Sequence, residues 1–251
     1  MTVAEIAAAA AAGGGAGAAN AVAGAGSLIT FPTLVALGIP ALSANVTSTV
    51  GLVPGAVGGA IGYRAEVRHQ RRRIVWFVVP MLVGAAIGTA LLLITSNATF
   101  ELVVPVLVAG SCLLLLLQPR LAQRLTRHGS ERSPLFVAGL TGAGAYAAYF
   151  GSAVGIMLIA LLTLFVDETV QRLNAVKIVL AGLANLLAAC VYAFLAPVNW
   201  EFAVTLMVSS LIGGQLGAHG ARRISGDTLR MGIAITGLVV AVVLGVEFYG
   251  G

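Results

Sequence analysis

Long hydrophobic segments, separated by short polar connections, make up most of this chain. Segments such as 74–96, 102–117, 178–196 and 231–246 stay mostly apolar for 16 to 23 residues. That length lets a helix cross a hydrocarbon core of about 30 Å. Barrel strands would instead be short segments of alternating polarity, which the pattern lacks. The pattern therefore predicts an all-α polytopic membrane protein.

The hydrophobic segments group into four blocks in each half of the chain. In the first half they cover about 4–37, 41–63, 74–96 and 102–118. In the second half they cover about 134–166, 172–196, 202–221 and 229–248. The first block of each half is long and is interrupted by glycines, which distinguishes it from the single spans that follow.

The two halves match at a constant offset of 129 residues without a gap. The offset pairs Asn45 with Asn174, and it also pairs these glycines: Gly13 with Gly142, Gly15 with Gly144, Gly26 with Gly155, Gly84 with Gly213 and Gly88 with Gly217. Transporters are commonly built from such repeats, with the binding site at their interface. We expect a first repeat at 1–118, an arginine-rich linker at 119–132 and a second repeat at 133–251, within one membrane domain.

Charge supports the membrane assignment and indicates an orientation. Charged residues make up 9% of the chain, whereas a soluble domain carries about a quarter. The thirteen arginines lie in four segments: Arg64, Arg68, Arg71, Arg72 and Arg73; Arg120, Arg124, Arg127 and Arg132; Arg172; and Arg222, Arg223 and Arg230. Because basic residues gather in cytoplasmic connections, we expect all four segments to face the cytoplasm. The high isoelectric point, about 9.8, is then a matter of topology, and no nucleic acid is expected as a partner.

This orientation requires block 134–166 to enter and leave the membrane on the same side. We therefore expect a hairpin there, with its tip near Gly151–Gly155, and by the repeat a second hairpin at 4–37, with its tip near Ala23–Ser27. Each repeat would be a glycine-tipped hairpin followed by three transmembrane helices, giving about ten membrane segments. The repeats would be inverted, and both termini would be periplasmic. A single pass at 4–37 is the alternative.

Lys177 is the only lysine of the chain and lies in a hydrophobic segment. Charged residues inside a span usually line a functional cavity. Alternatively, a flexible stem five residues after Arg172 could extend to the membrane surface. Asn174 shares the helical face of Lys177, and a compact ammonium suits an anion that must later be released.

Further candidate residues follow from the repeat and from the hairpin tips. Asn45, Thr47 and Ser48 occupy the first-repeat positions that match the region around Lys177, although helix capping and interhelical hydrogen bonds are alternative roles. Backbone N–H groups at a helix start attract anions, while glycine also permits tight turns. The tip candidates, with two matched residues just before the tips, are Gly26, Ser27, Ser152, Gly155, Asn20 and Tyr149.

Two segments resemble the TauE/SafE sulfite exporter family. One is GAGSLITFPTLVALGIPALSANVTSTVGLVPGAVGGAIGYR, and the other is YFGSAVGIMLIALLTLFVDETVQRLNAVKIVLAGLANLLAACVYAFLAPVNW. The second contains the Asn-Ala-x-Lys entry formed by Asn174 and Lys177. The resemblance covers both halves and implies transport of a small anion, such as sulfite or a sulfonate, in the bacterial inner membrane.

The pattern as a whole favours a secondary transporter of small anions that works by alternating access between the repeats. The chain has no GxxxxGK[ST] nucleotide-binding motif, and no HExxH or GxSxG motif, so neither ATP hydrolysis nor another enzymatic activity is expected. An anion channel, an uptake permease for another anion and an intramembrane enzyme are the alternatives. We expect no cofactor or metal, a small anion and lipid as partners, and a homodimer as one possible assembly.

Overall fold

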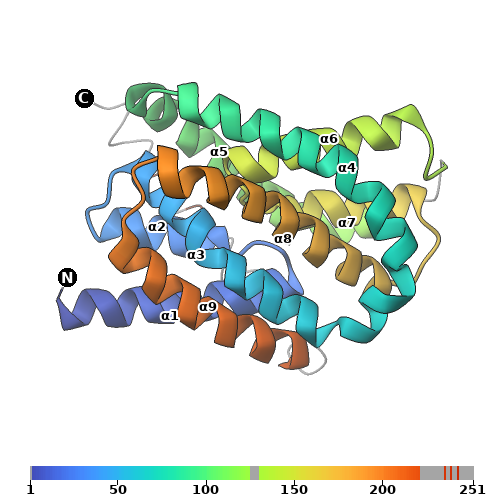
Figure 1. Ribbon diagram of the computed structural model, residues 1–251, viewed down its shortest axis with the longest axis horizontal. Coiled ribbons are helices and arrows are strands. Elements are labelled where there is room, and N and C mark those ends of the chain that lie inside the picture. Colours follow the sequence, from blue (N-terminus) through green and yellow to red (C-terminus); the bar gives the residue numbers. More distant parts are fainter. Residues whose placement is uncertain (1, 125–129, 221–234, 236–237, 239–241, 243–251) are drawn as a thin grey trace.

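The computed structural model describes residues 2–124 and 130–220, together with residues 235, 238 and 242. Helices α1 (Val3–Val22), α2 (Ser27–Ala36), α3 (Ala41–Gly62), α4 (Arg64–Ile94) and α5 (Asn97–Arg124) form the first half. Helices α6 (Pro134–Tyr149), α7 (Val154–Phe165), α8 (Val170–Leu195) and α9 (Trp200–Gly220) follow in the second half (Figure 1). The described part of the chain contains no strand, which confirms the all-α prediction.

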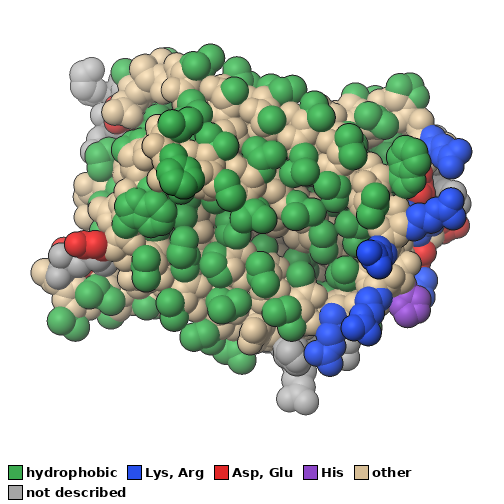
Figure 2. All heavy atoms as spheres, viewed as in Figure 1, with side chains coloured by type: hydrophobic (Ala, Val, Ile, Leu, Met, Phe, Trp, Pro, Cys, Tyr) green, Lys and Arg blue, Asp and Glu red, His purple; other side chains and the backbone are tan. Residues whose placement is uncertain are grey.

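Five of these helices are long and apolar enough to cross a membrane: α3, α4, α5, α8 and α9. Their outer surfaces are hydrophobic, as Trp76 on α4 and Phe194 on α8 show, with exposed fractions of 71% and 88%. Figure 2 shows hydrophobic side chains spread over most of the visible face. Such a surface suits lipid rather than water, so the chain is a multi-pass membrane protein.

The first block of each half is broken where the glycine pattern predicts. Helix α1 ends at Val22 and α2 begins at Ser27, while α6 ends at Tyr149 and α7 begins at Val154. Gly24 and Gly151 turn the chain with φ angles of 71° and 74°, a left-handed conformation that glycine adopts without steric cost. With 10 and 12 residues, α2 and α7 are about 15 and 18 Å long and too short to cross a membrane.

The two turns meet inside the molecule. Gly155 N donates a hydrogen bond to Gly24 O at 3.2 Å. A Cβ atom added at Gly155 would lie 2.5 Å from the Gly24 Cα atom, so the two backbones are in direct contact. Around them the halves interleave, because α1 and α3 pack on α9, and α4 packs on α6 and α8.

Helix α4 begins earlier than the hydrophobic pattern predicts. The arginine segment from Arg64 to Arg73, expected to be a loop, belongs to the same 31-residue helix as the apolar segment that follows it. The prediction of a loop is wrong because arginine, glutamate and glutamine have high helix propensity, so polarity alone does not end a helix. Helix α5 likewise continues to Arg124, into the predicted linker.

The basic side chains visible in Figure 2 gather at one end of the molecule. In the view of Figure 2 they lie at the right-hand end, where Figure 1 shows α3 leading into α4 and α7 leading into α8. Helix α1 begins at the opposite end. The arginine segment 222–230 and most of the tenth predicted membrane segment, 229–248, lie outside the described residues, so the number of ten segments stays a prediction.

Candidate functional site

A small cavity lies where the two hairpin tips approach α3 and α8. Its volume is about 40 Å³, counted as the space open to the centre of a water-sized sphere. One water molecule needs about 10–15 Å³ on this measure, so the cavity has room for a small polyatomic ion. Its polar side chains come from α1, α2, α3 and α8: Asn20, Ser27, Thr49, Lys177 and Asn185.

The Lys177 side chain turns inward rather than towards the membrane surface. It is 1% exposed, and its Nζ atom lies 3.5 Å from the backbone oxygen of Asn20. Among the described residues that line the cavity, none is acidic. The ammonium group is therefore buried beside the cavity, and no carboxylate among the described lining residues balances its charge.

The matched asparagines each fasten the opposite hairpin. Asn45 on α3 donates through Nδ2 to the backbone oxygen of Tyr149 at 2.9 Å. Asn174 on α8 donates through Nδ2 to the backbone oxygen of Ala21 at 3.1 Å. Each amide thus reaches from the helix that follows one hairpin to the end of the first arm of the other. These bonds hold both tips beside the cavity.

Side-chain hydrogen bonds also organise the tips themselves. Gly26 N donates to Asn20 Oδ1 at 2.7 Å, which closes the first turn. Ser27 Oγ donates to Ser152 Oγ at 3.1 Å and so joins the two tips. The Ser152 backbone oxygen in turn accepts from Ser111 Oγ of α5 at 3.2 Å. The tips are therefore fixed by polar contacts on the side facing the protein interior.

Not all predicted site residues reach the cavity. Thr47 Oγ1 accepts a hydrogen bond from Asn199 N at 2.9 Å, and Ser48 Oγ is hydrogen-bonded to Thr30 Oγ1. The predicted residues that line the cavity are Asn20, Ser27, Gly155 and Lys177. The predicted residues that do not line it are Gly26, Asn45, Thr47, Ser48, Tyr149, Ser152 and Asn174.

Comparison with known proteins agrees with this arrangement. The family model described as sulfite exporter TauE/SafE matches residues 9–244, almost the whole chain. The chain belongs to the TauE/SafE family. It is accordingly a membrane transporter, as the sequence predicts, and its hairpins, tips and cavity are those of a TauE/SafE chain.

Similar curated proteins carry transporter names as well. A probable membrane transporter protein of Haemophilus influenzae is 29% identical over 208 residues, covering 79% of this chain and 78% of that protein. The probable membrane transporter protein YfcA of Escherichia coli K12 is 22% identical, covering 80% of this chain and 74% of its own length. The probable membrane transporter protein ORF9 of a Sinorhizobium species is 22% identical, with coverages of 89% and 85%. No solved structure matches the chain.

Asn185 and Thr49 are the two polar residues lining this TauE/SafE cavity that the sequence interpretation did not include in the site, and Asn185 is the one on the helix of Lys177. It lies on α8 eight residues after Lys177, with Ala181 between them, and all three line the cavity. The i, i+4, i+8 spacing on one helical face was the available signal. It was weak because a polar residue inside a span also commonly bonds a neighbouring helix. Within the described residues, no group of three or more His, Cys, Asp or Glu side chains could hold a metal.

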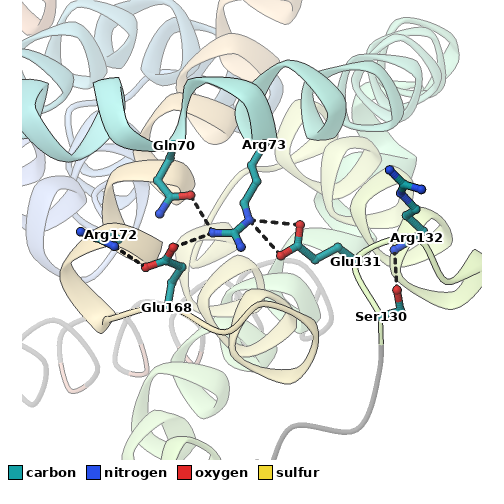
Figure 3. Close-up of polar contacts among 7 residues, drawn as sticks. All are labelled: Gln70, Arg73, Ser130, Glu131, Arg132, Glu168 and Arg172. Carbon is teal, nitrogen blue, oxygen red and sulfur yellow. Dashed lines mark hydrogen bonds and ion pairs between the residues drawn. The ribbon is translucent and has the colours of Figure 1, made fainter.

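The arginine-rich end holds a second polar cluster, shown in Figure 3. Arg73 Nη1 donates to Glu168 Oε1 at 2.7 Å and to Gln70 Oε1 at 3.0 Å. Arg73 Nε pairs with Glu131 at 2.9 Å, and Arg172 Nη1 pairs with Glu168 Oε2 at 2.9 Å. The cluster joins α4, the segment before α6 and the start of α8, so three of the arginine-bearing segments meet at one end.

Glu168 is the acidic centre of that cluster. Hydrogen bonds from Arg172, Gln70 and Arg73 lower the pKa of its carboxyl group to about 2. The carboxylate form is therefore favoured across the physiological pH range. In contrast to the cavity, this end of the molecule pairs its cations with carboxylates.

Proposed function

We propose that this TauE/SafE transporter carries a small oxyanion, with sulfite or an organosulfonate as the leading candidates, and that the cavity at the hairpin tips binds it. The observation that carries the proposal is the Lys177 ammonium, which is 1% exposed and shares its cavity with no acidic residue of the described lining. An isolated charge inside a protein costs several kcal/mol. A bound anion would offset that cost, which accounts for a lysine at this buried position.

The two hairpin tips support the same proposal. Helix α2 begins at Ser27 and α7 begins at Val154, and both residues line the cavity. The starts of both short helices therefore border the space beside Lys177. The positive end of a helix favours an anion. Together with the ammonium, they form an environment of one sign.

Cavity size limits the substrate. With a cavity volume of about 40 Å³, the site suits a compact anionic group with a short substituent. A large aromatic sulfonate would have to widen the contact between α3 and α8, where a Cβ at Gly182 would lie 3.0 Å from the Ala56 Cβ. We therefore assign small sulfur oxyanions and short-chain sulfonates to the site ahead of aromatic ones.

For the transport cycle we propose two inverted repeats that alternate access around this site. The repeats are 1–118 and 133–251, joined by the arginine-rich linker 119–132, with ten membrane segments in total. Three observations support the repeat. Asn45 and Asn174 make equivalent bonds to the opposite hairpins, and α1 packs on α9 as its counterpart α6 packs on α4. The matched residues Gly24 and Ala153 both adopt positive φ angles, 71° and 59°.

We also propose that the arginine-rich end faces the cytoplasm of the bacterial inner membrane and that both termini are periplasmic. Two points support this orientation. Ion pairs of Arg73 and Glu168 join three arginine-bearing segments at one end of the molecule, and basic residues prefer the cytoplasmic side of a membrane. An impermeant thiol reagent applied to cysteines placed at residue 2 and at Arg68 would test the sides independently of transport.

The central test is sulfite flux into proteoliposomes. Lys177→Ala should lower flux by about 100-fold or more, because a buried charge partner contributes about 3–5 kcal/mol to what it binds. Arg172→Ala is the matched control, since it removes a cation from the same helix, and its flux should stay within about twofold of wild type. Unchanged flux in Lys177→Ala would overturn the proposed site.

A further inference from the structure

Among the described residues that line the cavity, Asn185 is the one with a buried side-chain polar atom that has no hydrogen-bond partner. Its Oδ1 atom is buried, and no described residue donates a hydrogen bond to it. Leaving a buried acceptor unpaired is costly, and such an atom in a folded protein calls for an explanation. Because Asn185 lines the same cavity as Lys177, a ligand that occupies the cavity could supply the missing donor.

The carbonyl lies away from the ammonium along α8. Eight helical residues separate Asn185 from Lys177, a rise of about 12 Å between their backbones. Asn185 Oδ1 lies 3.9 Å from the position of a Cβ added at Gly151, whereas the Lys177 side chain lies 3.1 Å from a Cβ added at Gly155. The two groups thus border different parts of the cavity. A ligand that meets both must carry its donor on a different atom from its anionic oxygens.

Charge restricts the ligand further. Lys177 is the only titratable side chain among the described residues that line the cavity. Two tyrosine hydroxyls lie in the neighbouring part of the helix bundle, and both have protein partners. The Tyr149 hydroxyl of α6 lies 3.4 Å from Thr95 Oγ1. The Tyr192 hydroxyl of α8 donates to the Ala148 backbone oxygen. One cation balances a single negative charge. A dianion would leave a buried charge uncompensated, and an amino-substituted sulfonate would bring a second cation next to Lys177.

We propose that the transported substrate is a short hydroxyalkanesulfonate, whose sulfonate meets Lys177 and whose hydroxyl group donates a hydrogen bond to Asn185 Oδ1. The proposal rests on the proposed function and narrows its substrate class. The amide torsion of asparagine is broad, so the carbonyl can turn towards a hydroxyl group in the cavity that Asn185 lines. Asn185 then determines specificity, while Lys177 supplies affinity.

The test compares two probes of equal size, 2-hydroxyethanesulfonate and propane-1-sulfonate, in binding titrations with the purified full chain. Wild type should bind the hydroxylated probe about 2- to 10-fold more tightly, as one hydrogen bond allows. In Asn185→Leu this ratio should fall to about one, while Leu186→Ala, a change at the neighbouring exposed position, should keep the wild-type ratio. Asn185→Ala carries the same expectation if the leucine variant does not fold.

Three outcomes would overturn the inference. One is equal affinity of wild type for both probes, and another is an equal loss of both in Asn185→Leu, which would place the amide on the sulfonate. The third is a rise in stability of Asn185→Leu with the ratio preserved, which would mean that the carbonyl binds only water. Loss of both probes in Lys177→Ala keeps the proposed function intact in each case, whereas retention of both in that variant overturns the proposed function instead.

Discussion

Lys177 and Arg172 lie five residues apart on α8, yet their charges are balanced differently. Arg172, with a side chain 42% exposed, pairs with Glu168 at 2.9 Å, and Glu168 also pairs with Arg73. Lys177 is 1% exposed and shares its cavity with no acidic residue among the described lining. The helix therefore places one cation in a balanced cluster at its start and the other, little more than a turn later, in an unbalanced interior.

The difference separates two uses of charge. A solvent-exposed ion pair contributes about 0–1 kcal/mol, so the partly exposed pairs of the arginine-end cluster give a moderate gain and carry no large cost of buried charge. An unpaired buried cation instead lowers stability until something binds it. The buried charge of Lys177, unlike the charges of the arginine-end cluster, therefore requires a bound ligand to balance it. If this comparison holds, substitutions in the two regions should change stability in opposite directions.

The largest effect is expected for Lys177→Met, which replaces the ammonium with an apolar side chain of similar length. Without ligand, this variant should be more stable than wild type by about 1–4 kcal/mol, because replacing buried charge by well-packed apolar groups is often stabilising by that amount. Thermal unfolding of the purified protein in detergent measures the change. Sulfite should raise the unfolding temperature of wild type and not that of the variant.

The control for that measurement is Leu180→Met on the same helix, a fully buried position where a change of similar volume should cost less than about 1.5 kcal/mol. A Lys177→Met protein that is less stable than wild type would contradict the comparison. It would mean that the ammonium is already stabilised by contacts such as the one to Asn20 O at 3.5 Å.

An intermediate effect of opposite sign is expected for Arg73→Met. Arg73 contacts Glu131, Glu168 and Gln70, so its loss leaves two carboxylates without their shared cation. We expect a loss of about 1–2 kcal/mol, since the pairs form a network rather than one exposed contact. Arg68→Met, on the same helix, is the matched control and should change stability by less than about 0.5 kcal/mol. Equal effects of the two changes would show that the network contributes nothing.

Glycine spacing was sufficient to predict where the first hydrophobic block of each half is broken. The interruption of α1–α2 and α6–α7 follows from local turn chemistry, which is legible in sequence at Gly24 and Gly151. The isolation of Lys177 in an apolar segment marked it as a candidate, but left open whether its side chain turns inward or extends to the membrane surface. These features depend on neighbours in the chain, so a linear pattern contains them.

The partners of the polar side chains could not be predicted in the same way. Asn45 and Asn174 bind backbone oxygens in the opposite half, and backbone acceptors leave no mark on side-chain patterns. The bond between Ser27 and Ser152 likewise depends on how two distant turns meet. Asn185 was left out of the predicted site for the converse reason, since its significance lies in a partner that the described residues do not supply.

The smallest expected effect is the loss of stability at low pH, which we expect from Glu168 at the arginine-rich end. The pKa of Glu168 is lowered to about 2 by Arg172, Gln70 and Arg73, against about 4.3 for an unfolded glutamate. A depressed carboxyl pKa contributes stability that is present above the unfolded value and is lost as pH falls towards the folded one. Stability should therefore fall between about pH 4.3 and pH 2, and solvent screening limits this group's share to about 1 kcal/mol or less.

Thermal unfolding of wild type and Glu168→Gln across that pH range measures the contribution of the Glu168 carboxylate to stability. The glutamine variant should be slightly less stable than wild type at neutral pH and should approach it as the pH falls, because wild type then loses the same carboxylate. Glu66→Gln, near the start of α4, should follow the wild-type pH curve. A Glu168→Gln curve parallel to wild type would mean that the carboxylate makes no pH-dependent contribution, and the ion pairs at the start of α8 would then balance charge without stabilising the fold.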